Sequence, residues 1–239
     1  MSLEYITRNT EKIRKRIREA ERQAGRPEGS VRMIAAVKYA DPEELVYLCQ
    51  KEKVRDLGEN RVQQLLEHYQ SMEHPEELRW HFIGSLQTNK VKYIIDKVCM
   101  IHSLDSDKLA EEIEKQAAKR GIVMDVLVEI NSGEEENKGG LYPSEVEDFC
   151  QGLSRYPHLR HCGFMTMAPK CEKKSEYLKY FQQTSQQVLD IWTKKLHNIG
   201  RPILSMGMSE SFEEAIACGS DMVRVGRGLF LKDSEQSQK

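Results

Sequence analysis

The stretch "VRMIAAVKYADPEELVYLCQK" (31–51) contains a complete strand–turn–helix unit. Its first seven residues are almost continuously apolar, which is typical of a strand buried on both faces of a parallel sheet. Asp41 then stands at a helix N-cap position, and Pro42 follows at the first helical position, where an N–H group is not required. The stretch therefore predicts a buried strand over 31–37 and a helix over 41–51.

The same alternation continues along the rest of the chain. Short apolar runs predict eight strands, at 31–37, 54–57, 79–83, 98–102, 124–130, 159–165, 203–206 and 222–225. Segments of helical periodicity separate most of them, at 41–51, 60–70, 106–120, 142–154, 175–197 and 211–218. A further amphipathic helix is expected over 3–24, before the first strand, with an apolar stripe formed by Ile6, Ile13, Ile17 and Ala24.

Eight strands with intervening helices in a chain of 239 residues match a closed (β/α)8 barrel, the TIM barrel. An open doubly wound sheet is the alternative, but it favours fewer strands and usually has a glycine-rich turn after the first one. The first turn here reads "VKYADP" and has no glycine. We therefore predict an α/β fold, a (β/α)8 barrel with an extra N-terminal helix. Since no linker or low-complexity segment divides the sequence, residues 1–239 are expected to form one domain with a disordered tail at 232–239.

The composition argues against several classes of partner. The formal net charge is −2, so no broad cationic field is expected to attract nucleic acid or a membrane surface. No apolar run approaches the roughly 20 residues needed to span a bilayer, and charged residues near the start argue against a secretion signal, so we expect a cytoplasmic protein. The six cysteines are scattered, which favours reduced thiols. "HLRHC" (158–162) lacks a second ligand cluster, so no metal is expected.

Polar and glycine residues stand at the predicted carboxyl end of almost every strand, where the active groups of such barrels gather. The last two loops resemble a phosphate site. "SMGMSES" (205–211) supplies the hydroxyl groups of Ser209 and Ser211, and "RVGRG" (224–228) supplies Gly226 and Gly228, whose backbone N–H groups can approach an anion closely. The alternative is two tight turns and a capping serine.

Lys38 follows the first strand and faces the same mouth of the barrel. Apolar surroundings would disfavour its ammonium form and free the amine to attack a carbonyl group. The alternative is a lysine that extends outward to pair with Glu59. Together with a phosphate site across the mouth, the amine suggests pyridoxal 5′-phosphate (PLP) held as a Schiff base.

Arg224 precedes Gly226 by two residues, so both positions share one face of the last strand. A guanidinium there would either pair with an acid in the core or face the pyridine nitrogen of PLP. Because arginine keeps its proton, it would leave that nitrogen unprotonated, and a neutral pyridine is a poorer electron sink. Such a site would hold PLP and promote carbanion chemistry only weakly.

Eight ordered blocks of sequence resemble one known family over nearly the whole chain. They are "AAVKY" (35–39), "GEN" (58–60), "WHFIGSLQTNK" (80–90), "HSLDS" (102–106), "EINSGEEENKGG" (129–140), "GFMTMAP" (163–169), "LSMGMSES" (204–211) and "GSDMVRVGRGLF" (219–230). The chain is similar to the PLP homeostasis proteins, which are barrel relatives of the alanine racemase N-terminal domain. The resemblance implies a fold-type III PLP barrel without demonstrated turnover, which maintains vitamin B6 vitamers and the balance of amino and keto acids, with apo PLP-dependent enzymes as recipients.

The resemblance also implies a role for particular residues. Lys38 would form the Schiff base, Arg224 would face the ring nitrogen, and Ser209, Gly226 and Arg227, the last through its backbone, would hold the phosphate. Asn60, His81 and Met208 would line the ring. One departure is Val37, where many relatives carry a small hydroxyl residue.

Alanine racemases add a C-terminal β-domain with a second acid/base tyrosine, whereas this sequence ends nine residues after Phe230. Since Lys38 can serve only one face of a substrate, we expect no robust racemase activity, no catalytic residues and a monomer. Two other functions remain open: a PLP enzyme with a narrow substrate, and a barrel that binds another phosphorylated metabolite without covalent chemistry.

Overall fold

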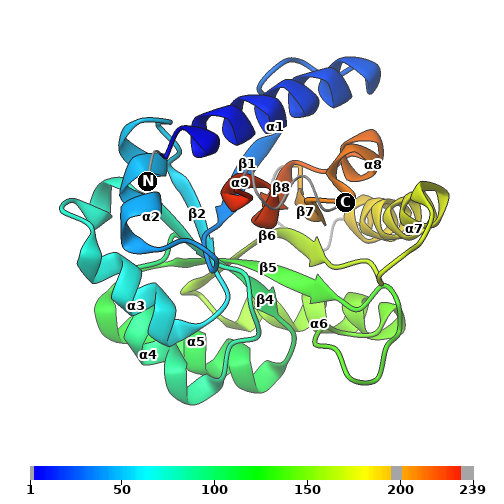
Figure 1. Cartoon of the computed structure of the whole chain (residues 1–239). Coiled ribbons are helices and arrows are strands. Elements are labelled where there is room, and N and C mark those ends of the chain that lie inside the picture. Colours follow the sequence, from blue (N-terminus) through cyan, green and yellow to red (C-terminus); the bar gives the residue numbers. More distant parts are fainter. Residues whose placement is uncertain (1–2, 195–200, 233–239) are drawn as a thin grey trace.

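The computed structural model describes residues 3–194 and 201–232, and eight parallel strands in it form a closed barrel (Figure 1). Each strand pairs with the next along the chain, and β8 pairs with β1. The strands are β1 (Arg32–Ala36), β2 (Asp56–Glu59), β3 (Arg79–Phe82), β4 (Met100–Leu104), β5 (Met124–Ile130), β6 (Leu159–Thr166), β7 (Ile203–Met208) and β8 (Met222–Val225). The predicted barrel is confirmed, with β2 and β4 beginning two residues later than expected.

Helices surround the barrel in the order that the sequence predicts (Figure 1). They are α1 (Glu4–Gln23), α2 (Pro42–Gln50), α3 (Val62–Ser71), α4 (Val91–Ile94), α5 (Asp107–Arg120), α6 (Val146–Gly152), α7 (Lys174–Thr193), α8 (Phe212–Ala217) and α9 (Arg227–Phe230). The short α4 and α9 were not predicted, because four residues are too few to show a helical period. Residues 195–197 of the helix predicted over 175–197, and 233–239 of the predicted tail, lie outside the described residues.

The expected cap of α2 is present. The Asp41 carboxylate accepts a hydrogen bond from the Glu44 backbone N–H at 2.9 Å, and the Glu44 carboxylate accepts one from the Asp41 N–H at 3.0 Å. This reciprocal pair satisfies two N–H groups that a helix start leaves free. The turn between β1 and α2 is thereby fixed, and Lys38 and Tyr39 lie in that turn.

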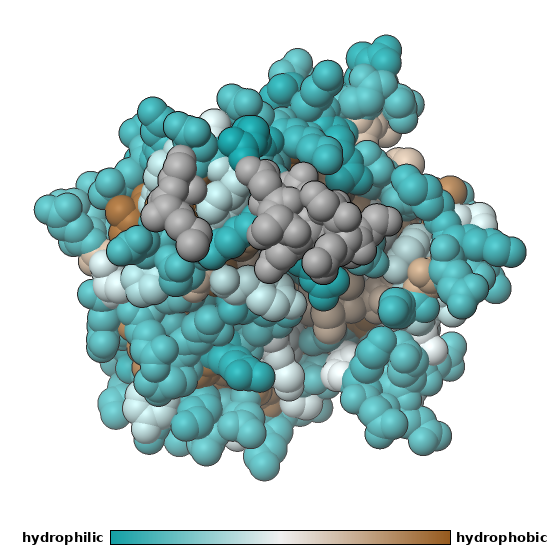
Figure 2. Space-filling view, viewed as in Figure 1, coloured by the Kyte–Doolittle hydropathy of each residue, from teal (hydrophilic) through white to brown (hydrophobic). Residues whose placement is uncertain are grey.

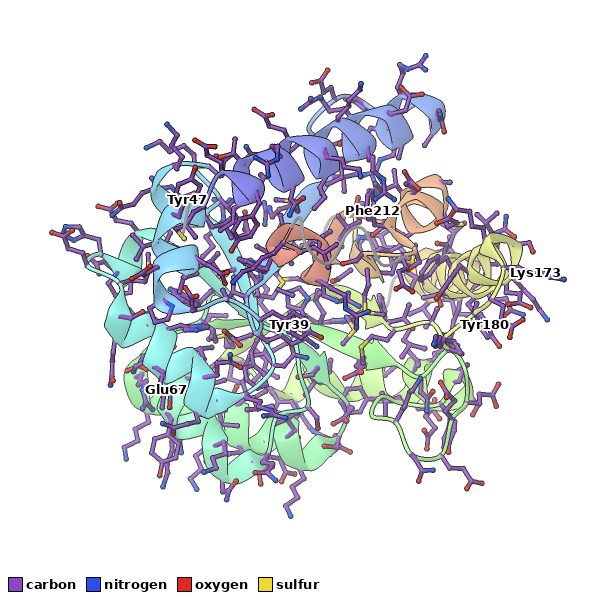
Figure 3. All side chains as sticks on the ribbon, in the orientation of Figure 1. Tyr39, Tyr47, Glu67, Lys173, Tyr180 and Phe212 are labelled. Carbon is purple, nitrogen blue, oxygen red and sulfur yellow. The ribbon has the colours of Figure 1, made fainter. Side chains whose placement is uncertain are left out.

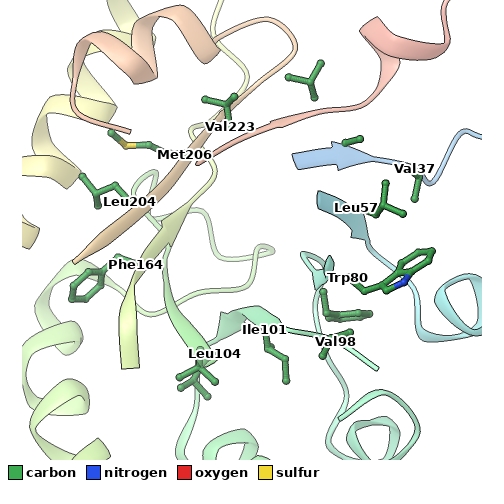
Figure 4. Close-up of a cluster of buried hydrophobic side chains, with 14 of the residues drawn as sticks. Val37, Leu57, Trp80, Val98, Ile101, Leu104, Phe164, Leu204, Met206 and Val223 are labelled. Carbon is green, nitrogen blue, oxygen red and sulfur yellow. The ribbon is translucent and has the colours of Figure 1, made fainter. Parts of the chain in front are cut away.

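The apolar side chains divide between the two sides of the barrel wall. The larger cluster lies between the strands and the helices and includes Leu57, Trp80 and Phe164 (Figure 4). A separate small cluster fills part of the barrel interior and consists of Ile34, Met100, Leu127, Met165 and Met222. Because a strand alternates its side chains between the two sides, both clusters come from the same apolar runs.

Helix α1 packs against α8 and α9 and closes the ring of helices between α2 and α8 (Figure 1). The Asn9 side-chain amide donates hydrogen bonds to the Leu229 carbonyl at 3.1 Å and to the Leu231 carbonyl at 2.9 Å. Arg16 on the same helix pairs with Glu213 at 2.9 Å. The extra helix therefore fixes α9, which begins at Arg227 beside the mouth of the barrel.

The face shown in Figure 2 is mostly hydrophilic, with separate hydrophobic side chains between polar ones. None of the described helices is both long and apolar enough to cross a membrane. The six cysteines are free thiols. Within residues 3–194 and 201–232, no group of three or more His, Cys, Asp or Glu side chains is placed to hold a metal ion.

Candidate functional site

A cavity of about 260 Å³ lies at the carboxyl ends of the strands. Most of the residues predicted for the site line it, coming from the ends of β1, β2, β7 and β8: Lys38, Asn60, Met208, Ser209, Arg224, Gly226 and Arg227. The lining also contains residues to which the sequence assigned no role, or only that of a supporting hydroxyl: Ala36, Tyr39, Ile83, Met167, Tyr177, Glu210 and Ser211. The strand ends therefore converge as a parallel barrel requires.

Lys38 lies at the rim of this cavity, but its surroundings differ from the prediction. Strand β1 ends at Ala36, Val37 occupies the last buried position, and the Lys38 side chain is exposed. Its Nζ atom lies 5.0 Å from the centre of the Tyr39 ring. The expectation of an apolar environment is thus wrong, because β1 ends at Ala36, two residues before Lys38, and Lys38 lies in the exposed turn that follows.

Glu59, which the sequence offered as an alternative partner for Lys38, pairs with a different residue. Glu59 is completely buried, and its Oε1 atom lies 2.6 Å from Nδ1 of the His68 ring on α3. The Glu59 carboxylate therefore pairs with His68, and the backbone carbonyl of Lys38 accepts a hydrogen bond from Gln64 at 3.0 Å.

His81 does not lie at the cavity where the resemblance put it. Its ring is buried inside the barrel and contacts Asp56, the first residue of β2, with Nε2 and Oδ1 3.2 Å apart. Ile83, two residues further along the chain, lines the cavity instead. Two residues of a strand span about 7 Å, so His81 lies one layer below the residues that form the mouth.

Arg224 forms part of the cavity floor and is almost fully buried. Its Nη1 atom donates to the carbonyl and the hydroxyl of Ser205, at 2.8 and 2.7 Å, and Nη2 donates to the Thr166 carbonyl at 2.9 Å. Burial lowers the pKa of Arg224 to about 10, while the charge of Glu129 acts in the opposite direction. The guanidinium is therefore protonated at neutral pH and held in one position.

A chain of hydrogen bonds connects Arg224 with the opposite end of the barrel. The Ser205 hydroxyl lies 3.1 Å from Nδ1 of His102, and Nε2 of His102 lies 3.0 Å from Nδ1 of His81. His81 then contacts the carboxylate of Asp56. Burial raises the pKa of Asp56, but hydrogen bonds from Arg79 and His81 outweigh it and bring the pKa to about 2.

The two ends determine how the protons are arranged in this chain. Arg224 can only donate and the ionised Asp56 can only accept. Asp56 accepts a hydrogen bond from Nε2–H of His81, so Nδ1 of His81 carries no proton and accepts from Nε2–H of His102. Nδ1 of His102 is then also unprotonated, and it accepts from the Ser205 hydroxyl. Burial lowers the pKa of His81 and holds that of His102 well below its usual range. Both imidazoles are therefore neutral.

Glu129, near the end of β5, is a second buried ionisable group close to Arg224. Burial, and after it the charge of Asp105, raises the pKa of Glu129 to about 7, although Arg224 acts in the opposite direction. Its carboxyl group can therefore gain or lose a proton near neutral pH. Glu129 lies in a block that the sequence analysis quoted, but no pattern there indicated that its side chain is buried beside an arginine.

The side of the cavity predicted to bind phosphate is built from backbone and hydroxyl groups. The Gly226 N–H points to the Ser209 hydroxyl at 3.4 Å, and Arg227 follows at the start of α9. A Cβ atom on Gly226 would lie 3.0 Å from the Ala36 carbonyl oxygen, so only glycine fits without a shift of the neighbouring strand. The Ser211 hydroxyl accepts a hydrogen bond from the Met208 N–H at 3.2 Å and so fixes the preceding turn.

Comparison with known proteins agrees with this geometry. The sequence model of the family described as "Alanine racemase, N-terminal domain" matches residues 8–233. The pyridoxal phosphate homeostasis protein of Aquifex aeolicus is 40% identical over 221 residues, which cover 92% of this chain and 94% of that protein.

Two solved structures are similar over nearly the whole chain. An unknown protein from Bifidobacterium adolescentis is 32% identical with a TM-score of 0.86, covering 95% of each chain. PipY of Synechococcus elongatus, solved with PLP bound, is 27% identical with a TM-score of 0.77, covering 90% of this chain and 99% of that one. On these sequence and structural matches, the chain belongs to the family of pyridoxal phosphate homeostasis proteins.

Proposed function

We propose that this protein binds PLP in the cavity at the carboxyl ends of the strands and acts in PLP homeostasis. The observation that carries the proposal is the convergence of three kinds of group on one cavity: the amine of Lys38, the guanidinium of Arg224, and the hydroxyl and backbone N–H groups of Ser209 and Gly226. PLP presents an aldehyde, a ring nitrogen and a phosphate, and each of the three groups suits one of them.

In this proposal Lys38 would hold PLP as a Schiff base, because its Nζ amine is the group at the cavity that can bond to the aldehyde carbon. Its exposed position at the rim leaves the amine accessible to a cofactor that enters from solvent. When bound, PLP supplies an electrophilic carbon and an aromatic ring that accepts electrons.

Arg224 is suited to face the ring nitrogen because part of its hydrogen-bonding capacity is free. Three of its N–H groups donate to Ser205 and Thr166, and the other two of the five that a guanidinium carries have no partner among the described residues. Since the guanidinium retains its proton, it can donate to an unprotonated nitrogen and does not supply a proton to it. The floor of the cavity thus favours binding over carbanion chemistry.

Asn60 provides a further indication that the cavity fits a polar ligand. Its side-chain oxygen is buried at the cavity, and no hydrogen-bond partner for it occurs among residues 3–194 and 201–232. A buried acceptor without a partner is costly, so a donor group on the ligand would stabilise the site. We assign Asn60 and Met208 to the lining around the ring, and His81 to the support of Arg224 from below.

The proposed role is that of a PLP-binding protein of the cytoplasm that supplies apo enzymes and balances amino and keto acids, with the whole chain acting as one domain and a monomer. Lys38 can move a proton on only one face of a bound amino acid, so robust racemisation is not expected. Turnover of D- or L-alanine at roughly 1 per second or faster would contradict this part of the proposal.

The test is borohydride reduction of PLP-treated protein, followed by mass spectrometry of its peptides. Wild type should carry the reduced adduct on Lys38, and Lys38→Ala should lose the adduct and the yellow absorption. Lys90→Ala, an exposed lysine outside this cavity, is the matched control and should retain both. In cells, Lys38→Ala should alter the pools of B6 vitamers. An unmodified Lys38 peptide would instead favour non-covalent binding of another phosphorylated metabolite, and spectral changes with one amino acid would favour a narrow PLP enzyme.

A further inference from the structure

Tyr39 is one of the cavity residues to which the sequence assigned no role, and it follows Lys38 directly in the chain. The residue is 52% exposed. Together with Met208, it is one of two exposed large hydrophobic side chains that line this cavity, within the part of the chain that the structure describes. In Figure 3, Tyr39 lies near the centre of the view, inside the ring of helices.

The ring of Tyr39 is near both the amine of Lys38 and the proposed phosphate side of the cavity. Nζ of Lys38 is 5.0 Å from the ring centre. On the other side, a Cβ atom built on Gly226 would lie 3.6 Å from Cδ2 of Tyr39, which is ordinary van der Waals contact. The ring is therefore a close neighbour of Gly226.

The hydroxyl end of Tyr39 is close to two cations. The charge of Lys38 lowers the pKa of Tyr39, burial acts in the opposite direction, and a contact with Arg227 lowers the pKa further. A donor hydroxyl flanked by an ammonium and a guanidinium is well suited to a phosphate ester, whose oxygens accept several charge-assisted hydrogen bonds.

We propose that Tyr39 is a phosphate-binding residue that closes the cavity over Gly226, so that its hydroxyl selects phosphorylated over unphosphorylated B6 vitamers and its ring slows their release. This inference rests on the proposed function, since it requires PLP in the same cavity. It extends that function by assigning ligand selectivity and retention to one exposed side chain.

The experiment measures the affinities of PLP and of pyridoxal, which has the same aldehyde but no phosphate, together with the dissociation rate of PLP. Tyr39→Phe keeps the ring and removes the hydroxyl. We expect it to weaken PLP binding about tenfold, the effect of one charge-assisted hydrogen bond, and to leave pyridoxal binding unchanged. Tyr39→Ala should in addition raise the PLP dissociation rate above that of Tyr39→Phe.

Tyr93→Phe is a matched control. Tyr93 is 44% exposed and has Nζ of Lys92 4.9 Å from its ring centre, but it lies outside this cavity. The control should bind both ligands as wild type does, and all variants should retain the wild-type circular dichroism spectrum.

The possible outcomes separate the inference from the function on which it rests. Wild type that binds PLP while Tyr39→Phe binds it equally well would overturn the role of Tyr39 alone. An equal loss of PLP and pyridoxal affinity would also overturn it, because the hydroxyl would then not address the phosphate. Wild type that binds neither ligand would overturn the proposed function, and the inference with it.

Discussion

Ser205 links Arg224 to the two buried histidines, and its replacement by alanine tests whether this hydrogen-bond chain stabilises the barrel. Ser205→Ala removes the oxygen that accepts from Nη1 of Arg224 at 2.7 Å and that lies 3.1 Å from Nδ1 of His102. The second hydrogen bond from Nη1, to the Ser205 carbonyl at 2.8 Å, remains. The substitution deletes one atom from a residue that is 1% exposed, so repacking is minimal.

The expected magnitude follows from the two groups that lose a partner. A hydrogen bond to a charged donor contributes about 1.5–3 kcal/mol, and a buried polar atom without a partner costs about 1–3 kcal/mol. Because the two effects share one site and are not additive, we expect a net loss of about 2–4 kcal/mol in the free energy of unfolding. Urea denaturation followed by tryptophan fluorescence measures this change, with an unchanged slope indicating that the unfolded state is not affected.

Ser103→Ala is the matched control. Ser103 lies on β4 next to His102 and is also 1% exposed, but its hydroxyl has no hydrogen-bond partner among the described residues. Removing a buried hydroxyl that makes no hydrogen bond should leave stability unchanged or raise it by about 1 kcal/mol. Equal losses in the two variants would refute the reasoning, since the hydrogen bonds of Ser205 would then contribute nothing beyond the burial of a small side chain.

Three further predictions concern the same barrel. Nitrogen-15 NMR should find the rings of His81 and His102 neutral at pH 7 with the proton on Nε2, and a ring that titrates at or above pH 6.5 would contradict the proposed hydrogen-bond chain. The folded-state pKa of Glu129 is raised from 4.5 to about 7, so the free energy of unfolding of wild type should fall as pH rises through this window. Glu129→Gln should remove up to about 3 kcal/mol of that loss. The same pH slope in wild type and Glu129→Gln would exclude Glu129 as the group responsible. In a titration with PLP, Gly226→Ala should bind at least about tenfold more weakly, because the added Cβ would lie 3.0 Å from the Ala36 carbonyl oxygen. Gly228→Ala is the control and should bind PLP as wild type does, because its Cβ would have no contact under 3.5 Å.

Much of the fold was readable from the chain because a strand in a closed parallel barrel is buried on both faces. Runs such as 31–37 and 124–130 are therefore mostly apolar, with Arg32, Asp125 and Glu129 as the charged exceptions, and the eight runs give strand positions within about two residues. The site residues at the ends of β1, β7 and β8 were predicted for a related reason. A lysine or a glycine–serine cluster directly after such a run can lie only at the rim.

The incorrect predictions concern depth and direction in the barrel. His81 has the correct strand and face, but it lies one layer below the cavity, where it contacts Asp56 from β2 and His102 from β4. The outward turn of Lys38 was missed because β1 ends at Ala36, two residues earlier. Tyr177 reaches the cavity from α7, and nothing in a helical period marks one residue of a helix as a neighbour of strand ends.

The sequence by itself determined the closed eight-stranded architecture and the rim positions of Lys38, Ser209 and Gly226, because apolar periodicity and strand-end chemistry are local properties. Only the tertiary structure decided which buried polar groups meet. The chain from Asp56 to Arg224 joins residues from β2, β3, β4, β7 and β8, and the stagger of neighbouring strands sets the height of each side chain. That stagger arises when the sheet closes, so no single segment contains it.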